Sequence, residues 1–232
     1  TKKDNGEFLI QMTQFTGSSQ VAHHLSVVTE GRVKFEDSGL GWKILGPDFL
    51  DSDVEIVAKQ CDADAYAASG QKCSAQRLLF VNRKWKQKGL LLAIKDLASN
   101  RGFSNLTLGP TLTWNNFRIA EHFSKLKEIP GYHLLFGGNF KDLEKCFSVP
   151  IEKYGTLVPT AVELPLQQLL DSKNFKLVTI ELFGPFQIVV VWEGQEDLEK
   201  ILNFLNDLPR HLTAAVVDRD PHFIEYVLGR TK

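Results

Sequence analysis

Short apolar runs alternate with amphipathic stretches along most of the chain. The runs at 77–81 and 186–192 are largely apolar and are typical of buried strands. Other stretches have apolar residues at helical spacing. After Asp53, apolar residues recur every three or four positions, at Val54, Val57, Cys61 and Ala65. This alternation predicts an α/β fold with a mostly parallel sheet flanked by helices.

Glycine, proline and capping residues divide the pattern into elements. We expect strands at 8–15, 32–35, 43–45, 77–81, 133–136, 157–162, 186–192 and 212–217. Helices are expected from about Val21 to Gly31, from about Asp53, over 90–98, from a cap at Thr113 to Pro130-Gly131, around 198–205 and over 223–228.

Composition limits the kinds of partner that the chain is expected to bind. Lysine and arginine total 27 against 28 acidic residues, so no global field favours a nucleic acid or a membrane surface. The sequence contains no run of about 18 apolar residues that would predict a membrane-spanning helix. A small-molecule substrate is therefore the expected partner. Cys61, Cys73 and Cys146 are too few and too scattered for a disulfide framework or a metal site, which predicts a reducing compartment and no bound metal.

Cys73 is the first candidate for chemistry. It lies in Ala68-Ser69-Gly70-Gln71-Lys72-Cys73-Ser74-Ala75, between a predicted helix and a predicted buried strand. A loop at a sheet edge can present a thiol to a cleft, which suits a nucleophile. Taken by itself, however, a lone cysteine is more often an inert small hydrophobic residue. Cys61, on an apolar stripe, and Cys146, in a loop without a motif, keep that second interpretation.

Four segments together carry a resemblance to a known family. Gly70-Gln71-Lys72-Cys73-Ser74 resembles the active-site loop of the aldehyde dehydrogenase superfamily. Phe15-Thr16-Gly17-Ser18 is similar to its strand-to-helix turn at the cofactor phosphates, and Glu181-Leu182-Phe183-Gly184-Pro185 to its nicotinamide-side motif. Residues 212–217 resemble a later strand of its catalytic domain. Each segment is a weak pattern, but the four occur in the family's order.

The segment around Glu36 is a variant. Most of the superfamily has Glu-Leu-Gly-Gly-Lys there, whereas this chain has Phe35-Glu36-Asp37-Ser38-Gly39-Leu40-Gly41-Trp42-Lys43. With the continuation to Asp48, it is similar to one branch of the 1-pyrroline-5-carboxylate dehydrogenases, which oxidise glutamate semialdehyde to glutamate. Considered without the family, Glu36 would be a solvated carboxylate at the end of a strand.

The resemblance implies two catalytic roles. Cys73 would be the nucleophile that forms a thiohemiacetal and then a thioester with the aldehyde. Glu36 would be the base that activates water for hydrolysis of the thioester. The backbone N–H of Cys73 would be one oxyanion donor. The second donor of the family, an upstream asparagine, has no counterpart here.

The same resemblance implies the binding residues and the cofactor, NAD. Gly17 and Ser18 would meet the pyrophosphate at a helix N-terminus, although a simple helix cap also explains them. Glu181 would bind the nicotinamide ribose, and Phe183 would pack near the nicotinamide ring. Ser74 would bind the α-carboxylate of the substrate, with added positive charge from Lys72.

Domain organisation is expected from the same comparison. Residues 1–35 would be the C-terminal remnant of an NAD-binding domain, and 36–232 an incomplete catalytic domain, so the chain is expected to be a fragment. The resemblance also implies a homo-oligomer for the full-length enzyme and residence in the mitochondrial matrix, with the cytoplasm as the alternative.

Two other functions remain open. A non-catalytic domain that keeps the fold and is inactive alone would explain the missing cofactor elements. A thiol-dependent acyl transferase or hydrolase using Cys73 would need a histidine partner. His23 and His24 follow the proposed phosphate turn on a helix and carry no catalytic motif, which argues against that function.

Overall fold

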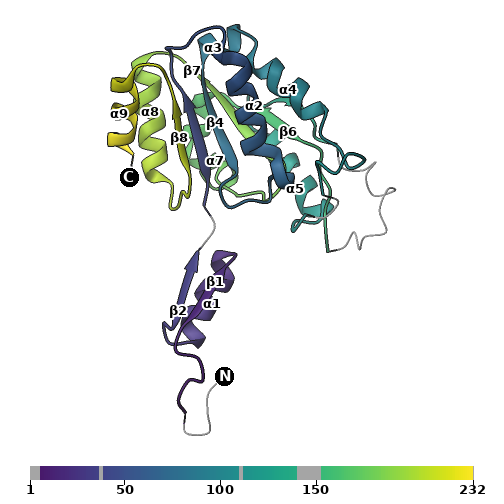
Figure 1. The fold of residues 1–232 in the computed structure, drawn as a ribbon, viewed down its shortest axis with the longest axis vertical. Helices are drawn as coiled ribbons and strands as arrows, with labels where there is room; N and C mark the ends of the chain where they lie inside the picture. Colours follow the sequence, from purple (N-terminus) through teal and green to yellow (C-terminus); the bar gives the residue numbers. More distant parts are fainter. Residues whose placement is uncertain (1–5, 37–38, 110–111, 140–152, 232) are drawn as a thin grey trace. The chain divides into compact units, whose positions relative to one another are not determined.

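A computed structural model describes residues 6–36, 39–109, 112–139 and 153–231 (Figure 1). The chain forms two compact units, Thr1–Gly39 and Leu40–Lys232. The predicted boundary between residues 35 and 36 lies four residues earlier, and the assignment of the units to cofactor and catalytic domains stays a prediction. Cys146 lies outside the described residues.

The first unit is a β-α-β element. Strand β1 (Thr13–Thr16) pairs in parallel with β2 (Val33–Glu36), and helix α1 (Ser19–Val28) connects them. The prediction that the first strand begins at Phe8 was wrong, since pairing with β2 starts only at Thr13. The apolar residues Leu9, Ile10 and Met12 of that predicted strand are exposed, so they lack the burial that an apolar run in a strand normally gains.

The second unit is built on a six-stranded sheet of order β5-β6-β7-β4-β3-β8. All neighbours pair in parallel except β5 and β6, which are antiparallel. The strands are β3 (Gly41–Leu45), β4 (Gln76–Asn82), β5 (His133–Phe136), β6 (Thr160–Glu163), β7 (Phe186–Trp192) and β8 (Ala214–Val217). The predicted fold class, a mostly parallel sheet flanked by helices, is confirmed.

Helices cover both faces of this sheet (Figure 1). On one face, Leu79 and Val189 pack with residues of α2 (Asp53–Tyr66), α3 (Arg83–Gln87) and α4 (Leu90–Ser99). On the other, Phe80 and Val190 pack with residues of α5, α6, α7, α8 and α9. These helices span Asn116–Lys127, Leu166–Leu170, Ser172–Val178, Gly194–Asp207 and Pro221–Arg230. Because neighbouring residues of a strand point to opposite faces, the middle of each central strand must be apolar on both faces.

The predicted cap of helix α5 was wrong. Asn115, not Thr113, occupies the N-cap position, and its side chain accepts a hydrogen bond from the backbone N–H of Arg118. Thr113 lies two residues earlier, where its own N–H donates to the side chain of Gln71 at 3.3 Å. Both residue types are good caps, so the sequence did not separate them.

Candidate active site

The candidate catalytic segments of the second unit lie at one edge of its sheet. The turn 71–75 precedes β4 and the loop 181–185 precedes β7, and these two strands are parallel neighbours. Their amino-terminal ends therefore meet at the same edge. Thr213, which precedes β8, lies there too, because its hydroxyl donates to the carbonyl of Ser74 at 3.3 Å. The fold brings together segments more than a hundred residues apart in the sequence.

Cys73 occupies an exposed position in a tight turn. The backbone N–H of Ala75 donates to the carbonyl of Lys72 at 3.1 Å, which closes the turn around Cys73. The preceding residues Ala68, Ser69 and Gly70 all have positive φ angles, an unusual run for residues that carry a Cβ. This irregular backbone ends α2 abruptly and turns the chain so that the thiol faces outward rather than into the core.

The neighbours of Cys73 are placed differently from each other. Ser74 is exposed next to the thiol. Lys72 is half-buried and its ammonium donates to the carbonyl of Ala63 at 3.1 Å, in the last turn of α2. A cation at a helix C-terminus offsets the partial negative charge there. The described geometry thus gives Lys72 a structural contact, and its role toward a substrate stays a prediction.

The loop before β7 presents the second set of candidates. Glu181 and Phe183 are half-buried, and they alternate with the buried Leu182 and Gly184. Successive N–H groups of residues 182, 184 and 186 each donate to the carbonyl two residues earlier, at 2.8–3.1 Å. Such consecutive narrow turns keep the loop compact and direct alternate side chains outward.

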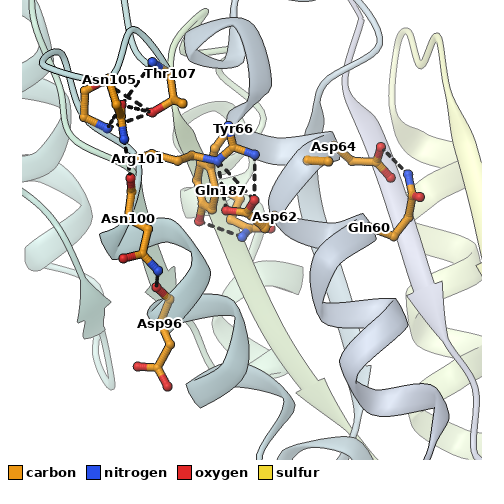
Figure 2. A network of polar contacts seen from close by, with 12 residues as sticks. Gln60, Asp62, Asp64, Tyr66, Asp96, Asn100, Arg101, Asn105, Thr107 and Gln187 are labelled. Atoms are coloured by element: carbon orange, nitrogen blue, oxygen red, sulfur yellow. Dashed lines mark hydrogen bonds and ion pairs between the residues drawn. The ribbon is translucent and has the colours of Figure 1, made fainter.

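A buried hydrogen-bond chain lies beneath this edge. Gln76, the first residue of β4, donates to Gln187 of β7 at 2.6 Å, and Gln187 donates to the hydroxyl of Tyr66 at 2.7 Å. The Tyr66 hydroxyl donates to the carbonyl of Thr160, the first residue of β6, at 3.3 Å. Figure 2 shows Tyr66 and Gln187, the two residues in the middle of this sequence of bonds. It fixes the starts of three parallel strands against one another.

An ion pair joins α2 to the loop that follows α4 (Figure 2). Arg101 binds both carboxylate oxygens of the buried Asp62 on α2, with a shortest distance of 2.6 Å. It thereby anchors the loop that follows α4. At the end of that loop, the N–H of Gly109 donates to the hydroxyl of Ser69 at 2.6 Å, one residue before Gly70. The backbone that leads to Cys73 is therefore held by a hydrogen bond from a loop 40 residues later in the sequence.

The first unit carries the other predicted residues. Thr16 and Glu36 are paired at the carboxyl ends of β1 and β2, and the N–H of Gly17 donates to the carbonyl of Glu36 at 3.2 Å. Ser18 is at the N-cap of α1, but its side chain makes no capping hydrogen bond. The phosphate-turn candidates and the base candidate thus lie together in this unit, whereas Cys73, Ser74, Lys72, Glu181 and Phe183 lie together in the other.

Cys61 contrasts with Cys73. It is completely buried on α2, and burial raises the pKa of its thiol to about 11, while the nearby Lys43 ammonium acts in the opposite direction. A thiol with such a pKa is protonated at neutral pH and a poor nucleophile. In the described part of the chain, no group of three His, Cys, Asp or Glu side chains is arranged to hold a metal ion, and no helix is long and apolar enough to cross a membrane.

Sequence reasoning missed two buried polar residues near this edge. Arg77, predicted only as part of a strand, is buried near the start of β4. His122 on α5 is packed among the rings of Trp114, Phe123 and Phe186. The charge in the otherwise apolar run 77–81 was a signal for Arg77. No motif surrounds His122 in the sequence, so the sequence carried no comparable signal for it.

We expect His122 to make the stability of the second unit depend on pH. Burial lowers the pKa of its imidazole from 6.5 to about 4, assisted by the positive charges of Lys125 and Arg118. As the pH falls, His122 gains its proton at a higher pH in the unfolded chain than in the folded one. The second unit should therefore lose on the order of 3 kcal/mol of unfolding free energy between pH 6.5 and pH 4. Urea unfolding followed by tryptophan fluorescence measures this, because Trp42, Trp85, Trp114 and Trp192 all lie in that unit.

The variant His122→Phe should flatten this part of the pH profile. His222→Gln is the matched control, since the His222 side chain is 89% exposed. Profiles of the wild-type chain and His122→Phe that stay parallel between pH 6.5 and 4 would contradict the assignment.

Comparisons with known proteins identify the family. The aldehyde dehydrogenase family model matches residues 7–232. The chain is 48% identical over 222 residues to "Delta-1-pyrroline-5-carboxylate dehydrogenase 12A1, mitochondrial" of Arabidopsis thaliana, and 47% identical over 221 residues to "Probable aldehyde dehydrogenase" of Linum usitatissimum. Each alignment covers 95% of this chain and 39% of the relative, so the chain spans about two fifths of their length.

Solved structures agree on the fold. A gamma-glutamyl-gamma-aminobutyraldehyde dehydrogenase from Burkholderia cenocepacia J2315 matches with a TM-score of 0.72 at 22% identity, over 95% of this chain and 42% of that one. The NAD+ complex of an aldehyde dehydrogenase from Bacillus cereus matches with a TM-score of 0.70 at 20% identity, over 96% and 43%. With a family model that matches nearly all of its residues, the chain belongs to the aldehyde dehydrogenase family, a family of oxidoreductases.

Proposed function

We propose that this chain supplies the nucleophile, the base and part of the cofactor site of an NAD-dependent dehydrogenase that oxidises L-glutamate 5-semialdehyde to L-glutamate. The observation that carries the proposal is the exposed thiol of Cys73. It lies in a turn at the sheet edge to which the Glu181–Phe183 loop also leads. A thiol there, beside residues suited to hold a nicotinamide, has the parts that aldehyde oxidation requires.

Cys73 performs the first step. Its thiolate sulfur adds to the aldehyde carbon and gives a thiohemiacetal, whose oxygen carries the developing negative charge. The backbone N–H of Cys73 is one donor for that oxygen. Covalent capture holds the carbon at a fixed place at the edge of the sheet, and it makes loss of a hydride chemically accessible.

Glu36 performs the last step. After the hydride has left, the thioester on Cys73 must be hydrolysed, and the carboxylate of Glu36 removes a proton from the attacking water. Glu36 is the last residue of β2, and its side chain is exposed rather than committed to the core. The carboxylic acid product then leaves and the thiol is restored.

The residues present fit a dinucleotide. In α1, the first N–H groups follow an exposed glycine, and the hydroxyl of Ser18 makes no capping bond, so both suit a pyrophosphate oxygen. Glu181 would hold the ribose hydroxyls and Phe183 would position the nicotinamide ring. NAD, when bound, would accept the hydride. Two solved relatives of the same fold are described as NAD+ complexes, which supports this choice of cofactor.

Substrate and location rest on the relatives. The Arabidopsis protein is named as a mitochondrial 1-pyrroline-5-carboxylate dehydrogenase, and two Staphylococcus proteins with the same enzyme name are 25% and 26% identical. We therefore propose glutamate semialdehyde as substrate and the mitochondrial matrix as compartment. Homo-oligomerisation of the full-length enzyme stays a prediction.

NADH formation tests the proposal. The assay compares the 232-residue chain with a chimera in which it replaces the aligned segment of the Arabidopsis relative, using glutamate semialdehyde as substrate. We expect NADH absorbance from the chimera and none from the chain alone, because the chain spans only part of its relatives. A folded chimera that forms no NADH, beside an active parent, would instead support a non-catalytic domain.

Ser74 provides a test of substrate choice. In the chimera, Ser74→Ala should raise KM for glutamate semialdehyde by about tenfold and leave KM for propanal unchanged, since a hydrogen bond to a charged group contributes about 1.5–3 kcal/mol. Ser99→Ala is the control, because Ser99 is an exposed serine on α4 whose hydroxyl bonds its own helix. An unchanged ratio of the two KM values would remove Ser74 as a carboxylate ligand.

A further inference from the structure

One buried cation touches both loops of the candidate site. Arg77, the second residue of β4, is 3% exposed. Its Nη2 donates to the carbonyl of Gly70, at the start of the Cys73 turn. Its Nη1 donates to the carbonyl of Gly184, directly after Phe183. A single guanidinium therefore links the segment that carries the nucleophile to the segment proposed to hold the nicotinamide.

The two loops also touch through their backbones. A Cβ added to Gly70 would lie 2.3 Å from the carbonyl oxygen of Gly184, which is far inside a van der Waals contact. The φ angle of Gly70 is +62°, in the region that favours glycine. The two backbones are therefore in contact here, and the carbonyls of Gly70 and Gly184 both accept hydrogen bonds from Arg77.

The surroundings of Arg77 belong to the same site. Its guanidinium carbon lies 5.8 Å from the centre of the Phe183 ring. Burial lowers the pKa of Arg77 to about 10, and the negative charge of Glu181 acts in the opposite direction. The guanidinium is thus still charged at neutral pH, and it interacts with Glu181 and Phe183, the two residues proposed to hold the cofactor.

Stability alone does not explain a charge at this position. Among the described residues, Nε of Arg77 has no hydrogen-bond partner, so part of the cost of burying the guanidinium is left without compensation. Apolar replacements of buried charged groups often leave stability unchanged or increase it. What an apolar side chain cannot do is bind two carbonyls in a fixed planar arrangement.

We propose that Arg77 is a positioning residue that sets the spacing between the Cys73 turn and the Glu181–Phe183 loop. In doing so it aligns the carbon held by the nucleophile with the nicotinamide side of the site. This inference rests on the proposed function. Arg77 itself touches neither substrate nor cofactor and acts through the backbones of the two loops.

Hydrogen exchange of the 232-residue chain tests the link without any substrate. In Arg77→Met, amides of residues 70–75 and 181–186 should both exchange at least roughly tenfold faster, because both lose the same partner. Arg77→Lys, which keeps the charge but has no planar fork, should release one loop and hold the other. Trp85→Phe is the control, since it removes a buried 2.7 Å bond to the carbonyl of Gly46 at the opposite end of β4.

Kinetics of the chimera separate positioning from folding. If Arg77 positions the loops, Arg77→Lys should lower the rate constant of the first NADH turnover by roughly ten- to a hundredfold, with KM for the aldehyde and the amplitude per enzyme unchanged. A lower amplitude at an unchanged rate would mean that Arg77 only maintains folding, and it would overturn the proposal. Exchange that accelerates in one loop alone in Arg77→Met, or equally throughout the sheet, would overturn it as well. The exchange results remain informative if NADH formation fails, so the two proposals can fail separately.

Discussion

Replacing Cys73 by alanine should abolish NADH formation by the chimera, with a fall in kcat of at least about a thousandfold. Without the sulfur no thiohemiacetal forms, and direct hydride loss from a hydrated aldehyde lacks the covalent hold on the reacting carbon. Stopped-flow absorbance should also show no burst in the first turnover. Stability should change little, since Cys73 is exposed and contributes nothing to the core.

Cys61→Ala is the matched control for this experiment. Cys61 is fully buried on α2, and its high thiol pKa leaves it without nucleophilic character, so this variant should keep kcat and lose only some stability. Peptide mapping after iodoacetamide treatment should find Cys73 modified far faster than Cys61. Equal loss of activity in both variants, or full activity of Cys73→Ala, would refute the role of Cys73 as nucleophile.

The sequence predicts the sheet better than the ends of its elements. The strands His133–Phe136 and Phe186–Trp192 have the predicted bounds, since glycine or proline adjoins one end of each run and directly marks where pairing must stop. Pattern alone did not give the antiparallel direction of β5, because alternation describes which side chains are buried and not the direction of the neighbouring strand. Short helices such as α3 and α6, of five residues each, are too brief to show a helical period.

The late start of β1 and the shifted cap of α5 have different physical causes. The run from Phe8 is apolar enough for a strand, but only Thr13–Thr16 finds a partner in β2, and a strand requires one. Thr113 and Asn115 compete for the same helix start, and the choice depends on the path of a backbone that Gln71, far away in sequence, helps to fix. Local pattern contains neither constraint.

For the candidate site, too, the sequence indicated the separate segments but not how they are packed together. Motifs identified the Cys73 and Glu181 segments separately, and the parallel order of β4 and β7 explains why both start at one edge. The contact that joins them, from Arg77 to Gly70 and Gly184, depends on residues 107 positions apart and on a buried charge. The resemblance proposes which residues carry chemistry, whereas their relative distance is a property of packing that the sequence does not contain.

Glu36→Gln should separate the two halves of the reaction. The amide cannot take a proton from water, so hydrolysis of the thioester should slow by about a hundredfold or more, the usual contribution of a general base. Thioester formation does not need this base. The chimera should therefore release one NADH per active site in a rapid burst and then nearly stop, unlike Cys73→Ala, which shows no burst.

An added nucleophile makes the assignment of Glu36 decisive. A thiol such as 2-mercaptoethanol takes the acyl group from the thioester by exchange and needs no activated water, so it should restore steady turnover to Glu36→Gln and have no effect on Cys73→Ala. Glu30→Gln is the control in the same unit, because Glu30 is an exposed carboxylate whose ion pair with Arg32, at 3.5 Å, lies at the surface. If Glu36→Gln loses the burst itself, the carboxylate acts before the thioester forms. If it turns over at the normal rate, the water is activated by another group, and the catalytic pair inferred from the sequence is incorrect.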